Sequence, residues 1–120
     1  MPYDPRMAAG AARFNAGDFF TAHEIWEAAW LEAVGPEKER FQGLVQIAAG
    51  YAKVESGIGA GAIKLLTLGR QRLRQLLQGE SDRVLQIFLD GVSADLERLE
   101  RLPVTDVSLA AVRLPRCELG

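Results

Sequence analysis

A histidine and a glutamate one helical turn apart, His23 and Glu27, are the residues whose types and spacing could support chemistry in this 120-residue chain. At about 100° per residue, they share one helical stripe with four aromatic residues, Phe19, Phe20, Trp26 and Trp30. Burial of a polar group is unfavourable unless the group is hydrogen-bonded or binds a ligand. The pattern therefore predicts that the imidazole and the carboxylate are sequestered together from water.

A buried polar network is the first interpretation of this pair. Glu27 would accept hydrogen bonds from His23 or from an indole N–H such as that of Trp30. Two glutamines one turn apart in a later helical segment, Gln42 and Gln46, are further donors. A satisfied network of this kind fixes the register of packed helices. Under this interpretation the protein is a helical domain with an interaction or scaffolding role and no catalysis.

A metal site is the second interpretation, because side chains at i and i+4 on a helix point the same way and can ligate one ion. The segment from His23 to Glu27 is similar to a zincin helix, but it has glutamate where a zincin has its second histidine. His23 is the only histidine, so further ligands would be carboxylates such as Glu24 or would come from a partner chain. We predict no cofactor, with a divalent metal at His23 and Glu27 as the alternative.

An acid–base enzyme acting on a small molecule is the third interpretation. Partial desolvation among aromatic rings would suit Glu27 and His23 to exchange a proton, and Gln46 would orient them. No nucleophile, phosphate-binding loop or oxyanion motif accompanies the pair in the sequence. His23 and Glu27 remain the candidate catalytic residues under this alternative, whether or not a metal assists.

The charge balance limits the classes of partner. The chain has 14 basic and 16 acidic residues, for a net charge of −2, whereas nucleic-acid and anionic-membrane binding usually needs a basic excess. A basic run with no acid inside it occurs at Lys64, Arg70, Arg72 and Arg74; a solvated helix face is its ordinary explanation and RNA binding the alternative. We expect a protein partner or a second copy of the chain, with neither membrane nor nucleic acid.

Cysteine usage and the N-terminal residues bear on the compartment. A single cysteine, Cys117, cannot form an internal disulfide. The first residues lack the basic stretch and apolar run of a secretory signal. We expect a cytoplasmic protein.

Glycine and proline divide the chain into helical segments. We expect helices over residues 5–16, 18–35, 37–56, 59–78, 81–88 and 93–102. No segment alternates like a strand, and short links make neighbouring helices antiparallel. The predicted fold is all-α: two packed antiparallel helical hairpins with packing like that of tetratricopeptide repeats, plus a C-terminal helix. The helix over 37–56 is apolar around more than half its circumference, and Gly43 and Gly50 would let a neighbour approach it closely, so it should be central.

The chain is expected to form one domain over residues 1–103, followed by an arm or tail over residues 104–120 that lacks a clear period. The tail carries four apolar residues that could cover a neighbouring subunit, Val107, Leu109, Val112 and Leu114. This pattern is the basis for predicting a homodimer.

The chain also resembles a known family. The run Phe14-Asn15-x-Gly17-Asp18-Phe19-Phe20-x-Ala22-His23-Glu24-x-Trp26-Glu27-x-x-Trp30, which contains an HExWE motif, is similar to the defining motif of the domain of unknown function 309 family. Blocks at residues 41–48 and 57–66 extend the resemblance, which covers roughly residues 10–102. It implies a small helical bundle and draws attention to His23, Glu27, Trp30 and Gln46. No activity is established for that family, so the resemblance implies none.

Overall fold

The computed structural model describes residues 4–119, and within this range it contains helices and no strand. The elements in chain order are α1 (Pro5–Asn15), α2 (Phe19–Glu32), α3 (Gly35–Glu55), α4 (Gly59–Gly79), α5 (Arg83–Glu100), η1 (Val104–Asp106) and η2 (Leu109–Ala111). The all-α class predicted from the sequence is confirmed. None of the helices between residues 4 and 119 is long and apolar enough to cross a membrane.

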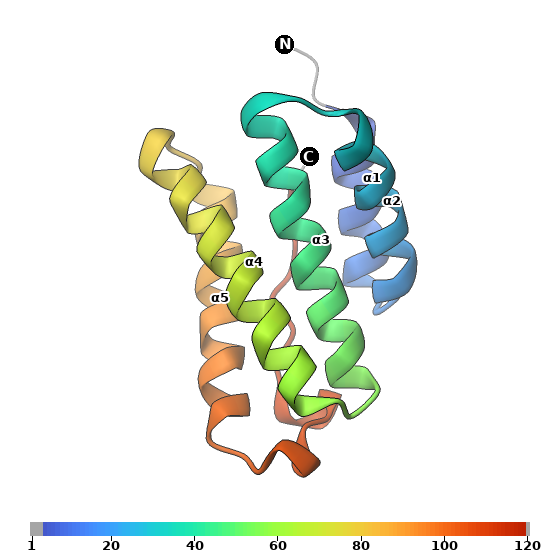
Figure 1. Ribbon diagram of the computed structural model, residues 1–120, viewed down its shortest axis with the longest axis vertical. Coiled ribbons are helices and arrows are strands. Elements are labelled where there is room, and N and C mark those ends of the chain that lie inside the picture. Colours follow the sequence, from blue (N-terminus) through green and yellow to red (C-terminus); the bar gives the residue numbers. More distant parts are fainter. Residues whose placement is uncertain (1–3, 120) are drawn as a thin grey trace.

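Consecutive helices run antiparallel and form an elongated bundle of 44 × 27 × 20 Å (Figure 1). The long helix α3 lies in the middle, with α2 packed on one side and α4 on the other. Helix α1 packs on α2, and α5 packs on α4. The central position predicted for the helix over 37–56 is therefore confirmed.

Short polar caps and glycines set the first helix boundaries. The carboxylate of Asp4 accepts a hydrogen bond from the backbone N–H of Arg6, and that of Asp18 accepts one from Thr21, which satisfies free donors at the starts of α1 and α2. Gly17, at a φ of 80°, reverses the chain in a backbone region that suits glycine. These boundaries match those expected from the sequence to within one or two residues.

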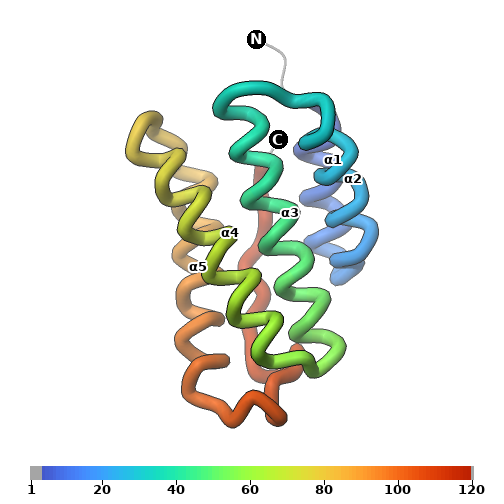
Figure 2. Tube along the Cα trace, viewed as in Figure 1, coloured from blue at the N-terminus to red at the C-terminus, as the bar shows by residue number. Residues whose placement is uncertain are grey.

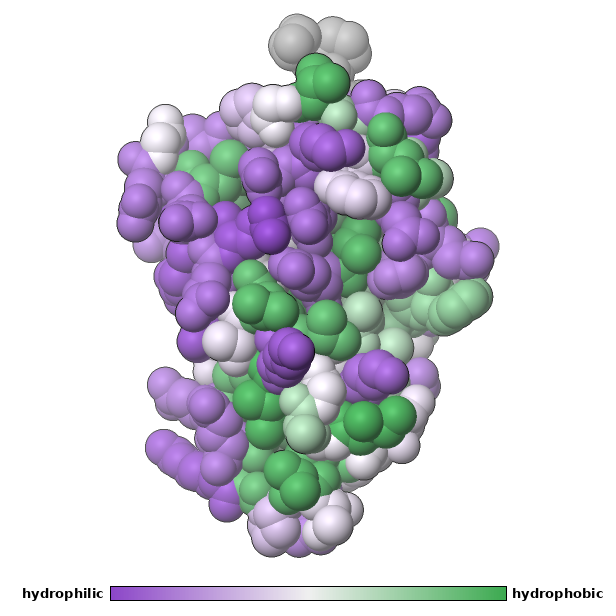
Figure 3. Space-filling model, viewed as in Figure 1, coloured by the Kyte–Doolittle hydropathy of each residue, from purple (hydrophilic) through white to green (hydrophobic). Residues whose placement is uncertain are grey.

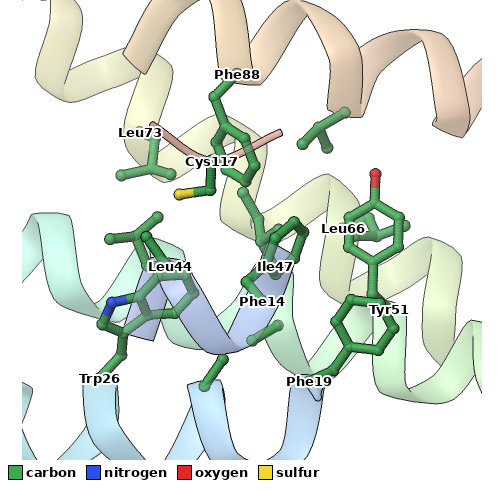
Figure 4. Packing of buried hydrophobic residues seen from close by; sticks show 14 of the residues in the cluster. Phe14, Phe19, Trp26, Leu44, Ile47, Tyr51, Leu66, Leu73, Phe88 and Cys117 are labelled. Atoms are coloured by element: carbon green, nitrogen blue, oxygen red, sulfur yellow. The ribbon is translucent and has the colours of Figure 1, made fainter. Parts of the chain in front are cut away.

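The contact between α3 and α4 depends on glycine, as the sequence indicated. A Cβ atom on Gly43 would lie 2.5 Å from Leu73, and one on Gly50 would lie 2.7 Å from Leu66. The two helices therefore approach more closely than any larger residue would permit. Figure 4 shows the core beside this contact, where the ring of Phe14 packs edge-on at 5.3–5.5 Å against three aromatic rings, those of Phe19, Tyr51 and Phe88.

Helix α5 is continuous, so the expectation of two helices over 81–88 and 93–102 is wrong. Asp82 caps α5 through the backbone N–H of Leu85, but Ser93, the expected second cap, lies inside the helix and its hydroxyl accepts from Arg74. The buried stripe continues past Gly91, from Leu89 to Val92 and into the second half of the helix. Packing of that stripe keeps the helix intact, and Gly91 leaves room for Pro115, which a Cβ atom would approach to 2.4 Å.

The C-terminal strap, residues 107–119, returns along the bundle and ends near its opposite end (Figure 2). Val107, Cys117 and Leu119 are buried in the core of their own chain. The side chain of Asn15 donates to the carbonyl of Cys117 at 2.7 Å and accepts from its N–H at 2.8 Å.

The apolar residues of the tail pack against the core of their own chain, whereas the sequence suggested that they cover a neighbouring subunit. The homodimer itself stays a prediction. Val107 is buried, and the other three apolar side chains pack against the same core, Leu109, Val112 and Leu114. Tertiary contacts hold a segment that has no helical period of its own. Residues 1–3 and 120, which belong to the predicted segments 1–103 and 104–120, lie outside the described residues.

Candidate functional site

The pair His23 and Glu27 lies on α2, with the imidazole Nε2 3.9 Å from the carboxylate Oε2. The side chain of His23 is 28% exposed and that of Glu27 is 49% exposed. The separation exceeds hydrogen-bond length, and an ion pair forms only when the imidazole is protonated. The prediction that both groups are sequestered from water is wrong, and the pair lies at the edge of the helix facing solvent.

The reason is the rotation of α2 about its axis. Its buried residues follow the helical spacing Phe19, Ala22, Trp26 and Ala29. His23 and Glu27 each follow a buried residue directly, so they are rotated by about 100° from the buried face. Phe20, which defined one side of the predicted stripe, is 67% exposed for the same reason. Helix α2 does have an apolar face, as predicted. The centre of that face lies at Ala22 and Trp26 and not at His23 and Glu27.

Trp30 contacts the start of α3 rather than Glu27. The ammonium of Lys38 lies 4.5 Å from the centroid of the Trp30 ring and donates to the Trp30 carbonyl at 2.8 Å. The indole Nε1 of Trp30 is buried and makes no hydrogen bond. In contrast, the indole of Trp26 donates to the carbonyl of Met7 at 3.2 Å. Trp30 therefore packs at the α2–α3 connection and does not join a polar network.

The other residues predicted for the network, Gln42, Gln46 and Glu24, form no hydrogen bond with His23 or Glu27 among residues 4–119. Gln46 accepts a hydrogen bond from Arg72 of α4 at 3.4 Å, Gln42 is half-buried on α3, and Glu24 is exposed. The expected His/Glu/Gln core network does not form: Gln46 is bonded to α4 instead, and Glu24 and Glu27 are exposed.

A buried polar cluster does exist, but elsewhere. Asp95 of α5 is 1% exposed and accepts four hydrogen bonds. They come from the Tyr51 hydroxyl at 2.7 Å, the Arg98 guanidinium at 2.7 Å, and the backbone N–H groups of Arg113 at 2.9 Å and Leu114 at 3.2 Å. We call these five residues the Asp95 cluster. It joins α3, α5 and the C-terminal strap.

The electrostatics of the Asp95 cluster follow from its burial. Burial, with the negative charge of Asp95 nearby, raises the pKa of the Tyr51 phenol far above its ordinary value. The phenol therefore stays protonated and donates to the carboxylate at any physiological pH. Such a fully partnered network fixes how the helices and the strap fit together.

The sequence contains a signal for Asp95 that the sequence analysis did not use. Asp95 lies three residues after Val92 and four before Leu99, inside the apolar stripe of α5. A polar residue inside an apolar helical pattern was the signal that drew attention to His23. The same signal is present at Asp95, and here the residue is buried. The partners could not be inferred, because two of the four donors are backbone groups of the strap.

The solvent-facing side of α2 forms a surface that we call the α2 stripe: Phe20, Glu24, Glu27 and Leu31. These residues recur at i, i+4, i+7 and i+11, so they share one face. Phe20 and Leu31 are each 67% exposed. Helix α2 also carries three carboxylates and neither lysine nor arginine. The stripe is therefore both apolar and acidic.

Comparison with known families gives one match, the family described as Domain of unknown function (DUF309), over residues 7–65. The chain belongs to this family. No curated protein and no solved structure matches the chain. The DUF309 match covers α1 to α3 and the start of α4, and so includes the α2 stripe and Gln46. The Asp95 position and the strap lie beyond it.

Three further features of this DUF309 protein bear on the candidate chemistry. Residues 4–119 contain no group of three or more His, Cys, Asp or Glu side chains arranged to hold a metal. Cys117 is buried, and burial raises the pKa of its thiol to about 12, so the nucleophilic thiolate does not form near neutral pH. Two clefts of about 660 and 510 Å³ lie along the C-terminal half of α4, and a third of about 620 Å³ lies between the α4–α5 turn, the starts of α1 and α3 and the end of the strap. Neither His23 nor Glu27 lines any of these three clefts.

Proposed function

We propose that this DUF309 domain is a non-catalytic interaction module that binds a protein partner through the α2 stripe. The observation that supports this function is the 67% exposure of both Phe20 and Leu31 on one face of a helix whose opposite face is buried. Large apolar side chains gathered on one exposed face are typical of protein–protein contact sites. Glu24 and Glu27 lie between these two apolar residues and would orient the partner through their charges.

The chemistry of the stripe favours an amphipathic helix with basic residues as its partner. Helix faces of this kind bind through apolar anchors at helical spacing, here Phe20 and Leu31. The two carboxylates between the anchors would pair with lysine or arginine on the partner and disfavour acidic segments. His23 beside Glu27 lies at the edge of the same surface.

Catalysis at His23 and Glu27 is the less favoured function. Both side chains are partly exposed and neither lines one of the three clefts described above, whereas small-molecule sites are usually built in a concave pocket. The single cysteine, which has no partner for a disulfide, also leads us to propose a cytoplasmic location.

A titration with designed peptides tests the proposed function. An amphipathic Lys/Leu helical peptide is added to the ¹⁵N-labelled full chain, and its Glu/Leu counterpart serves as the charge control. We expect amide shifts concentrated in α2 with the basic peptide and none with the acidic one. The variant Phe20→Ser/Leu31→Ser should weaken binding roughly tenfold or more, as expected when anchor residues are truncated.

The matched control is Val84→Ser/Ile87→Ser, which removes two exposed apolar side chains from α5 instead. It should leave the affinity for the basic peptide unchanged. Shifts scattered over the whole surface, or an equal loss of binding in the control variant, would contradict a specific role for the α2 stripe.

A further inference from the structure

We infer that the partner of the α2 stripe is the outer face of α4 on a second copy of this chain. The inference rests on the function proposed above and names its partner. Helix α4 carries four basic residues and no acidic residue, whereas α2 carries three acidic residues and neither lysine nor arginine. The two helices lie on either side of α3, so their outer faces belong to different parts of the surface (Figure 1).

The outer face of α4 matches the α2 stripe in spacing. We call it the α4 stripe: Ala60, Lys64, Leu68 and Gln71, all exposed at i, i+4, i+8 and i+11. Leu68 is 40% exposed and supplies an apolar contact beside the cation of Lys64. Figure 3 shows the α3–α4 side of the molecule, where hydrophobic side chains gather over the N-terminal half of α4. The stripe is the basic and apolar counterpart of the α2 stripe.

The charges on both stripes are free to bind another molecule. Lys64 is the charged residue of the α4 stripe and takes part in no ion pair among residues 4–119. Elsewhere on α4, Arg72 pairs with Glu39 and Arg74 with Asp90. On α2, Glu24 likewise has no ion-pair partner in that range, and Glu27 faces only His23 at 3.9 Å. Unpaired charges of opposite sign would therefore meet if α2 of one copy packed on α4 of the next.

The same charges determine the symmetry of the contact. A two-fold contact of α2 against α2 would bring like carboxylates together and is disfavoured. A contact between α2 and α4 is heterologous, and it leaves one free stripe of each kind on every pair of molecules. A single helix on a single helix buries little area, so the assembly should be weak and should grow with concentration rather than stop at a fixed dimer.

Sedimentation equilibrium of the full chain at low ionic strength tests the inference by charge exchange. The acidic-face variant is Glu24→Lys/Glu27→Lys, and the basic-face variant is Lys64→Glu. We expect the average mass of the wild type to rise with concentration and to fall again in high salt. Each variant alone should associate at least roughly tenfold more weakly. An equimolar mixture should recover association to about the wild-type level, because each variant then offers the face that the other needs.

The matched control is Arg83→Glu, which makes the same charge change as Lys64→Glu at an exposed arginine of α5 and should associate like the wild type. A wild type that stays monomeric at millimolar concentration, a mixture that does not recover, or an acidic-face variant that associates more strongly would overturn the inference. If the basic peptide still binds α2 while the chain stays monomeric, the self-contact fails and the proposed function stands. If the basic peptide does not bind α2 and the chain also stays monomeric, both the proposed function and the self-contact fail.

Discussion

The Asp95 cluster and the His23–Glu27 pair are both polar groups within apolar helical patterns, yet one is buried and the other faces solvent. Asp95 is 1% exposed and accepts four hydrogen bonds from three parts of the chain. His23 and Glu27 lie 3.9 Å apart and are 28% and 49% exposed. The difference shows that a polar residue enters the core where other elements supply its donors. Helical periodicity alone does not decide its position.

The comparison separates stability from surface chemistry. The Asp95 cluster ties α3, α5 and the strap together, so its loss should loosen the whole bundle. The His23–Glu27 pair lies within one turn of α2, and a partly exposed pair of that kind contributes little to the free energy of unfolding. The DUF309 match contains the exposed pair but not Asp95. Substitutions in the two regions should therefore change different properties.

The largest expected effect is that of Asp95→Ala. The substitution leaves the Tyr51 hydroxyl, the Arg98 guanidinium and two backbone N–H groups of the strap without their buried acceptor. We expect the free energy of unfolding to fall by about 3–5 kcal/mol, measured by urea denaturation. The control Asp90→Ala, at an exposed carboxylate of the same helix, should change it by less than about 0.5 kcal/mol. Equal losses would remove the distinction drawn here.

A second expected effect concerns the buried thiol of the strap at high pH. The pKa of Cys117 is raised from 9.0 to about 12 by burial, so above pH 9 the unfolded thiol loses its proton while the folded thiol keeps it. The unfolded state then binds fewer protons, and stability must fall as pH rises from 9 to 12. Relative to Cys117→Ala, the wild type should lose about 2 kcal/mol between pH 8 and 10.5, measured by denaturant titration at each pH. A constant difference between the two proteins would show that the strap does not bury the thiol.

A smaller effect is expected for Tyr51→Phe. The variant removes one hydrogen bond to Asp95 at 2.7 Å and leaves the ring and the other three donors in place. The free energy of unfolding should fall by about 1.5 kcal/mol, as for a hydrogen bond to a charged acceptor. Combined with Asp95→Ala, the effects should be less than additive, because both act on the same contact. Full additivity would place Tyr51 outside the cluster.

Much of the fold was predictable from the sequence because it is set locally. Aspartates and glycines at the ends of α1 and α2 fix those helices through nearby backbone groups. Gly43 and Gly50 indicated the close contact on α3. These features depend on residues within one or two turns or on the absence of a side chain, and both can be read directly.

The errors share a different physical cause, which is long-range packing. The strap has no helical period, and its place is fixed by Asn15, about a hundred residues away in the chain, and by Asp95. The rotation of α2 depends on which of its neighbouring apolar residues meet α1 and α3. The sequence pattern shows that the helix has an apolar side, but the centre of that side can be misplaced by one residue. A shift of one residue places His23 and Glu27 beside the buried face instead of at its centre.

The most direct test of the account is one variant, Glu27→Ala, measured in two ways. We predict that its free energy of unfolding differs from the wild type by less than about 0.5 kcal/mol, since an exposed pair contributes little. We also predict that its affinity for the basic amphipathic peptide falls by at least roughly threefold, since the lost carboxylate faces the partner. A variant that loses about 1–3 kcal/mol of stability but keeps its peptide affinity would show that Glu27 is a structural residue and would contradict the account.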